Sequence, residues 1–202
     1  MAYVFDFIII SYIAFAFFMT FIIIRHFLNI KKLRKITKRH WQIAFLLFFW
    51  ITGTIVFYGS FIEPQNLVVS QTKININKTT QTENLKIAFL ADFHLGPFKQ
   101  EKFLEKIIEK VAEQKPDIIL LGGDFIHQKE SEAKYFTPIK KMTDIAPVFA
   151  VWGNHEYNVD YNDKSEFRDM TAGLKKVFSE SGIQVLNNEA RLLTIKSSKF
   201  YL

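Results

Sequence analysis

Two long apolar stretches occupy the first third of the chain. Val4 to Ile24 carries a single charged side chain, Asp6, and Trp41 to Phe61 carries none. Each stretch is about 21 residues long, and about 20 residues of helix are enough to cross the hydrocarbon core of a bilayer. The pattern therefore predicts a membrane hairpin over residues 1–62, with spans at about 4–24 and 41–61.

Two other interpretations of the first stretch are weaker. A cleavable signal peptide has a basic start and a small-residue cleavage site, and the chain shows neither. A buried core helix is the second alternative, but uncharged runs of this length are rare in soluble domains. Two membrane spans remain the better prediction.

The rest of the chain alternates between strand-like and helix-like patterns. Residues 63–84 form a polar linker in which 67–76 favours an edge strand. Strands are expected at 85–91, 117–121, 147–152, 183–186 and 192–196, and helices at 98–114, 132–142 and 163–181. Helical crossovers make the first three strands parallel. The chain is therefore predicted to be an α/β protein with a globular domain over residues 85–202.

The net charge of +6 comes from one loop. Residues 25–40 contain seven Lys and Arg and no acid, so the rest of the chain sums to −1. A basic loop between two spans stays in the cytoplasm, which predicts a multi-pass cell-membrane protein with an extracytoplasmic globular domain. Little positive charge is left for a nucleic-acid surface, so no nucleic-acid partner is expected. With no cysteine, the chain cannot form a thiolate metal site or a disulfide.

A short polar cluster follows each of the first three expected strands of the globular domain. In an open α/β sheet, sites form at the carboxyl ends of the strands. Carboxylate, amide and imidazole donors without thiolates suit Mn, Fe or Zn ions. Taken singly, each cluster could be a turn or a helix cap, but together they predict a metal centre. The clusters are Asp92-Phe93-His94, Gly123-Asp124 and Gly153-Asn154-His155-Glu156.

These clusters, in this order on successive strands, resemble the D-x-H, G-D and G-N-H-[D/E] motifs of the calcineurin-like metallophosphoesterases. The resemblance implies an αββα-type sandwich and a centre of two divalent metal ions. It implies that Asp124 bridges the two ions and that His155 acts on the substrate as the catalytic residue. Glu156 is expected to support its loop. The implied metal ligands are Asp92, His94, Asp124 and Asn154.

The chain departs from the family pattern in two places. His127 stands where the family has a second carboxylate, three residues after Asp124, and its role is left open. No histidine follows His155, although the family completes its metal shell with later histidines. We therefore expect the phosphoesterase domain at 85–202 to be incomplete at its C-terminus, as part of a longer protein or as a remnant with weak or no activity.

The main functional hypothesis is a membrane-anchored phosphoesterase that hydrolyses a phosphate mono- or diester with two divalent metal ions. Its position at a membrane makes a lipid-linked substrate attractive, since relatives cleave the pyrophosphate of UDP-diacylglucosamine. The alternative is a catalytically weak or inactive membrane protein that binds a metal or a partner. The sequence leaves the substrate, the identity of the metals and the oligomeric state open.

Overall fold

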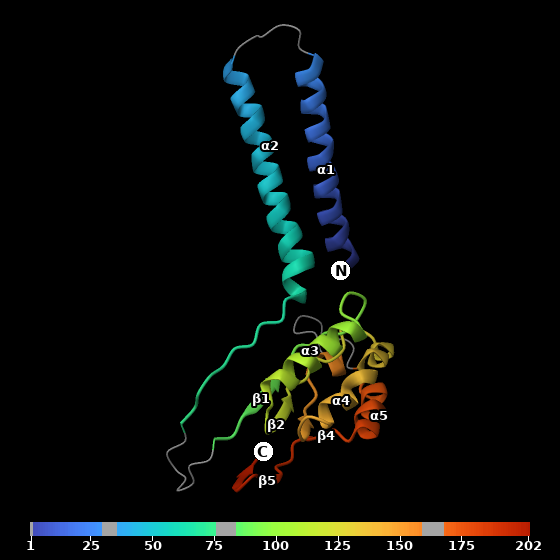
Figure 1. The fold of residues 1–202 in the computed structure, drawn as a ribbon. Coiled ribbons are helices and arrows are strands. Elements are labelled where there is room, and N and C mark those ends of the chain that lie inside the picture. Colours follow the sequence, from blue (N-terminus) through green and yellow to red (C-terminus); the bar gives the residue numbers. More distant parts are fainter. Residues whose placement is uncertain (1, 30–35, 76–83, 159–167) are drawn as a thin grey trace. The chain divides into compact units, whose positions relative to one another are not determined.

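The computed structural model describes residues 2–29, 36–75, 84–158 and 168–202. The chain divides into two compact units, Met1–Val68 and Val69–Leu202 (Figure 1). Each unit is described by itself below.

The first unit consists of two long helices, α1 (Ala2–Asn29) and α2 (Ile36–Phe57). A π-helical turn, η1 (Tyr58–Ile62), and a 3-10 turn, η2 (Glu63–Gln65), extend the second helix. Pro64 lies in the last turn and the backbone becomes extended at Asn66. By length and composition, the helical segments Phe7–Arg25 and His40–Gln65 are long and apolar enough to cross a membrane.

The two helices contact each other through small, aromatic and hydroxyl side chains. Ile9, Ala16 and Ile23 are buried at intervals of seven residues on α1. Trp50 donates a hydrogen bond to the hydroxyl of Thr20 at 3.0 Å, and the hydroxyls of Tyr12 and Thr52 also share a hydrogen bond. Such polar contacts between helices hold the pair together where the surroundings are apolar.

The second unit is built around a parallel four-stranded sheet in the order β1-β2-β3-β4. Its strands are β1 (Ile87–Leu90), β2 (Ile118–Leu121), β3 (Val148–Ala150) and β4 (Gln184–Val185). The connections contain α3 (Glu101–Gln114), η3 (Glu130–Ile139), α4 (Lys140–Thr143) and α5 (Ala172–Ser181). The three parallel core strands and the α/β class predicted from the sequence are confirmed.

Several boundaries differ from those expected. The helix predicted at 98–114 begins at Glu101, and the segment predicted at 132–142 is a 3-10 helix that becomes α-helical only at Lys140, after Pro138. The helix predicted at 163–181 begins at Ala172, while residues 163–167 lie outside the described residues. Residues 67–75 of the expected edge strand form no strand with any described part of the chain, and residue 76 lies outside the described residues.

A β-hairpin lies on one face of the sheet. It consists of β5 (Leu192–Ile195) and β6 (Ser198–Tyr201), which pair antiparallel. Leu193 of the hairpin is buried against Ile118, Phe149 and Leu186. Phe89, on strand β1 at the edge of the sheet, is 70% exposed. The strand predicted at 192–196 is present as β5.

Candidate metal centre

The loops after β1 and β2 remain paired beyond the ends of the strands. The backbone N–H of His94 donates to the carbonyl of Asp124 at 2.9 Å, and that of Leu95 donates to Phe125 at 2.8 Å. The N–H of Asp92 donates to Gly123 at 3.2 Å. Because the strands are parallel, this continued pairing places the D-x-H and G-D clusters next to each other at the carboxyl edge of the sheet.

The backbone at the candidate ligands is left-handed. Asp92, His94 and Asp124 have φ angles of 55°, 45° and 56°. Asp92 and His94 therefore do not lie on the extended backbone that would point two residues of spacing two to the same side. Residues other than glycine rarely adopt this conformation, and each instance costs of order 1 kcal/mol or more. Such costs persist where the surrounding structure fixes the backbone, and they cluster at functional sites.

Two glycines permit the close approach of the second and third loops. Gly123 has a φ angle of 94°, and a Cβ atom there would lie 2.5 Å from the backbone nitrogen of Gly153. A Cβ atom on Gly153 would overlap the carboxylate of Asp124. Both positions therefore require glycine if Asp124 is to reach the loop that carries Asn154 and His155.

Glu156 joins the same two loops through a fully buried carboxylate. Its oxygens accept hydrogen bonds from the backbone N–H groups of Asp124, Phe125, Ile126 and Gly153, at 2.9, 2.7, 3.2 and 2.8 Å. A buried negative charge is stable only when several donors compensate for its lost hydration. Glu156 thus supports the loops, as the sequence predicted.

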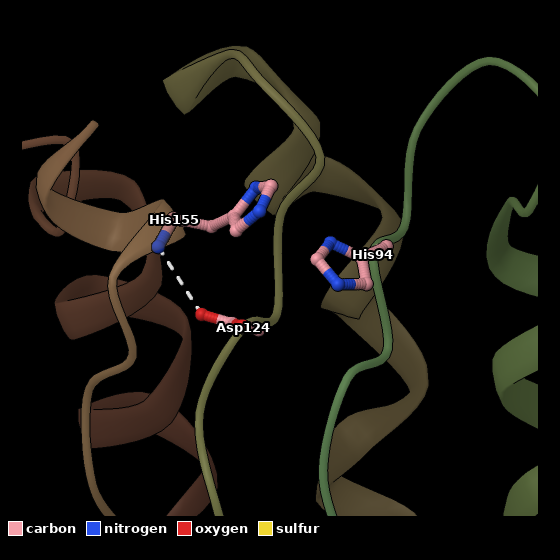
Figure 2. A group of neighbouring side chains, drawn as sticks. All are labelled: His94, Asp124 and His155. Carbon is pink, nitrogen blue, oxygen red and sulfur yellow. Dashed lines mark hydrogen bonds between the residues drawn. The ribbon is translucent and has the colours of Figure 1, made fainter. Parts of the chain in front are cut away.

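His94, Asp124 and His155 come together in front of these loops. One potential ligand atom from each lies within 4.8 Å of the others, and the two imidazole rings are 4.3 Å apart between centroids. The backbone N–H of His155 donates to Oδ1 of Asp124 at 3.1 Å. Figure 2 shows the two imidazoles pointing toward each other on one side of the Asp124 carboxylate.

The hydrogen bond of His155 determines which ring nitrogen carries its proton. Nδ1 lies 2.7 Å from the carbonyl oxygen of His127. A carbonyl oxygen only accepts, so Nδ1 of the neutral ring must be the donor. Nε2 is then left with a lone pair that can bind a metal ion or accept a proton.

His94 has the properties of a metal ligand. Its Nδ1 atom is buried and has no hydrogen-bond partner among the residues that the structure describes. Burial lowers the pKa of His94 below its usual value, and the neighbouring His155 lowers it further. A neutral imidazole is the form that binds metals. The nitrogen and oxygen donors here therefore fit a divalent transition metal ion.

The other predicted site residues lie at the edge of this group. Asp92 is exposed, and its carboxylate is 3.7 Å from Nε2 of His94. Asn154 is exposed at the N-cap of the turn η4 (His155–Tyr157). The ring of His127 is 6.3 Å from that of His94 and 6.4 Å from that of His155. Within the described ranges, the tight group contains His94, Asp124 and His155 only.

Three supporting residues were not singled out from the sequence. Phe93 and Phe125, each next to a candidate ligand, are buried and belong to an aromatic cluster with Phe136. Glu132 is a buried carboxylate that accepts backbone hydrogen bonds from residues 127–129. The bulky apolar residues beside the candidate ligands are a signal for the first two, whereas an acidic residue near a helix start gives no sequence signal that could single out Glu132.

Comparison with known proteins shows which family the globular region resembles. The family model described as calcineurin-like phosphoesterase matches residues 85–199, more than half of the chain. Phosphodiesterase YaeI of Escherichia coli is 31% identical over 119 residues, which are 58% of this chain and 42% of that protein. UDP-2,3-diacylglucosamine pyrophosphatase LpxG of Chlamydia trachomatis is 31% identical over 107 residues, 50% of this chain and 31% of that protein.

A relative from an animal also matches. The "Transmembrane protein with metallophosphoesterase domain" of Danio rerio is 28% identical over 109 residues, 53% of this chain and 25% of that protein. The chain thus spans less than half the length of these curated relatives.

Proposed function

Because this chain belongs to the calcineurin-like phosphoesterase family, we propose that it is a membrane-anchored hydrolase that cleaves a phosphate mono- or diester. The observation that carries this proposal is the convergence of His94, Asp124 and His155 at the carboxyl edge of a parallel sheet. The family relation supports metal-dependent hydrolysis in general. The particular residues and their roles are our proposal.

Four residues would hold two divalent metal ions, which could be Mn, Fe or Zn. Asp124 would bridge them, because its carboxylate lies between the D-x-H loop and the loop with Asn154. Asp92 and His94 would complete one position, and Asn154 would contribute its amide oxygen to the other. Two observations support this assignment. Nδ1 of His94 has no hydrogen-bond partner among the described residues, and all the proposed ligand atoms are nitrogen or oxygen.

His155 would act directly on the substrate. When bound, divalent ions supply charge neutralisation at the phosphoryl group and lower the pKa of water. With Nδ1–H held by the carbonyl of His127, the lone pair of Nε2 can take up a second proton, and the resulting imidazolium can donate from Nε2 to a phosphoryl oxygen or a leaving group. The backbone N–H of His155 donates a hydrogen bond to the carboxylate of Asp124, so the position of the His155 ring is coupled to that of a proposed metal ligand.

The rest of the fold is consistent with the family's two-sheet architecture. We propose that β5 and β6 belong to the second sheet of an αββα sandwich, because Leu193 packs against Ile118 and Phe149 of the first sheet. The two sheets then share an apolar layer, as sheets packed face to face do.

We propose that α1 and α2 span a membrane. Large apolar side chains such as Phe18 and Phe48 are 59% and 61% exposed, which suits a lipid environment. The basic residues between the spans favour a cytoplasmic loop and an extracytoplasmic phosphoesterase domain. Membrane anchoring, together with a relative named for a pyrophosphatase of UDP-2,3-diacylglucosamine, makes a lipid-linked phosphoester the favoured substrate class.

Hydrolysis of a chromogenic phosphodiester by the detergent-purified chain, with Mn²⁺ or after EDTA treatment, tests this function. Because no histidine follows His155 in residues 1–202, we expect weak metal-dependent turnover, and Asp124→Ala and His155→Ala should each remove most of it. Asp144→Ala, which changes an exposed aspartate outside the site, is the matched control and should keep the parent rate. Turnover that survives EDTA, or that Asp124→Ala leaves unchanged, would contradict the proposal.

A further inference from the structure

Glu132 is a buried carboxylate to which the proposed reaction assigns no role. It lies near the start of η3 and is 6% exposed. One of its oxygens, Oε2, accepts backbone hydrogen bonds from His127 at 2.9 Å, Gln128 at 2.8 Å and Lys129 at 3.0 Å. Three donors on one charged oxygen form a strong, directional anchor, so the backbone of residues 127–129 is held in one conformation.

The anchored segment carries the acceptor that orients His155. The carbonyl of His127 receives the hydrogen bond from Nδ1 of His155 at 2.7 Å. The N–H of the same residue also donates to the carbonyl of Leu95 at 3.1 Å. Residue 127 is therefore fixed at its N–H by Glu132 and Leu95, and it presents its carbonyl to the ring of His155.

Space around this segment is closed on the side of Gly96. A Cβ atom at Gly96 would lie 2.9 Å from Cβ of His127 and 3.2 Å from Oε1 of Glu132. The segment thus fits between the D-x-H loop and Glu132 without spare room. We therefore expect a change at either contact to shift residue 127 and its carbonyl.

The tautomer of a neutral histidine is set by the hydrogen bond that one of its nitrogens makes. If the carbonyl of His127 moved away, Nδ1 of His155 would lose its acceptor. The ring could then carry its proton on Nε2 instead, and it could rotate away from His94 and Asp124. A ring misplaced in this way should lower kcat rather than the affinity for the substrate, because the position of the proton matters at the reacting group.

We propose that Glu132 is a positioning residue for His155. It acts through the backbone of residues 127–129, and it keeps the proton of His155 on Nδ1 with Nε2 directed to the site. Its role differs from that of Glu156, which holds the backbone of Asp124 and Gly153 directly. The catalytic consequence rests on the proposed function, whereas the structural contact does not.

Imidazole ¹⁵N chemical shifts of the full chain in detergent, freed of metal with EDTA, report the tautomer of each neutral histidine. The His155→Asn variant identifies the signal of His155 among the five histidines. We expect the parent to show the Nδ1–H form at His155. In Glu132→Ala the signal should move to the Nε2–H form or to a mixture of the two, and Glu132→Gln, which keeps an oxygen acceptor, should restore part of the parent signal.

Two further variants separate positioning from folding. Gly96→Ala pushes on the same segment from its other side, so it should change the His155 tautomer even if Glu132→Ala does not fold. His127→Ala keeps the backbone carbonyl and is the matched control, in which the Nδ1–H form should persist. An unchanged Nδ1–H signal in folded Glu132→Ala, or in Gly96→Ala if the former does not fold, would overturn the proposal.

Kinetics with the Mn²⁺-loaded chain complete the test. Glu132→Ala should lower kcat by about tenfold or more with little change in KM, since the ring is misplaced while the metal ligands remain. An equal loss through KM alone would contradict a positioning role. If residues 1–202 hydrolyse phosphodiesters too weakly for these kinetics, as the absence of later histidines leads us to expect, the tautomer measurement decides whether Glu132 positions His155.

Discussion

At the scale of single residues, the site depends on side chains that do no chemistry. Glu156 and Glu132 are both buried, and both bind backbone N–H groups of loops that carry candidate ligands. The hydrogen bond to Glu156 helps to keep Asp124 in a left-handed conformation that residues other than glycine rarely adopt. The aromatic neighbours Phe93 and Phe125 hold the same loops from the core side. The strain at the ligands is thus balanced by contacts made nearby.

The first prediction concerns Glu156. Each carboxylate oxygen of Glu156 accepts hydrogen bonds from two backbone N–H groups. In Glu156→Gln, an NH₂ group replaces one of these oxygens, so two buried N–H donors would face another donor instead of an acceptor. We expect the free energy of unfolding to fall by about 2–4 kcal/mol. Urea unfolding of the chain in detergent measures it, with the exposed Glu180→Gln as control. Equal unfolding midpoints for Glu156→Gln and the parent would show that this carboxylate does not stabilise the loops.

At the scale of elements, the hairpin β5–β6 is tied to the end of the sheet opposite the site. Lys196, in the hairpin turn, contacts the carboxylate of Asp117 at 2.8 Å, and the N–H of Lys86 donates to the same carboxylate at 2.8 Å. The hydrogen bond from Lys196 lowers the pKa of Asp117 below its usual value, and the bond from Lys86 adds to this effect. The ionised form is therefore favoured in the folded protein.

The second prediction follows from the sign of this pKa shift. A lowered pKa in the folded state contributes stability above about pH 4, and that contribution is lost as the pH falls through the folded-state value. We expect Asp117→Asn to reduce the free energy of unfolding by about 1 kcal/mol at pH 7, since the pair is partly solvated. The difference from the parent should vanish in the most acidic buffers. A difference that stays constant with pH would exclude a role for the charge.

The pattern of apolar and polar residues was sufficient to place the elements but not their ends. The strands around Ile118 and Val148 could be predicted because continuous apolar runs are typical of buried parallel strands. Helix starts were missed at Glu101 and Ala172, where no Ser, Thr, Asp or Asn side chain caps the first turn. Local pattern carries little information where a helix begins without such a cap.

The sequence indicated which residues to consider for the proposed site, but it did not indicate the geometry in which the structure places them. Asp92, His94, Asp124 and His155 were selected because each follows an apolar run. Their left-handed backbone depends on contacts between segments that are distant in sequence. The position of residue 127 depends on a backbone hydrogen bond to Glu132. Neither leaves a periodic signal, so sequence patterns could not have shown them.

At the scale of the whole molecule, the third prediction concerns orientation. The seven Lys and Arg residues at 25–40 should hold that loop in the cytoplasm, which places Asp124 and its neighbours outside. A reporter that is active only in the cytoplasm, fused after Leu202, should be inactive in the parent. Replacing the seven residues with Gln should raise its activity, because the orienting charge is lost. Full cytoplasmic activity of the parent fusion would show the opposite orientation.

The most direct measurement of the central claim is metal binding by the site itself. Thermal unfolding of the detergent-purified chain should be followed with increasing Mn²⁺ or Zn²⁺, because an ion that binds only the folded protein stabilises it by about 2.7 kcal/mol at a hundred times its Kd. The parent and the Asp144→Ala control should gain stability from the metal, and Asp124→Ala should lose most of that gain. If Asp124→Ala is stabilised by metal as much as the parent is, the metal centre does not lie at Asp124.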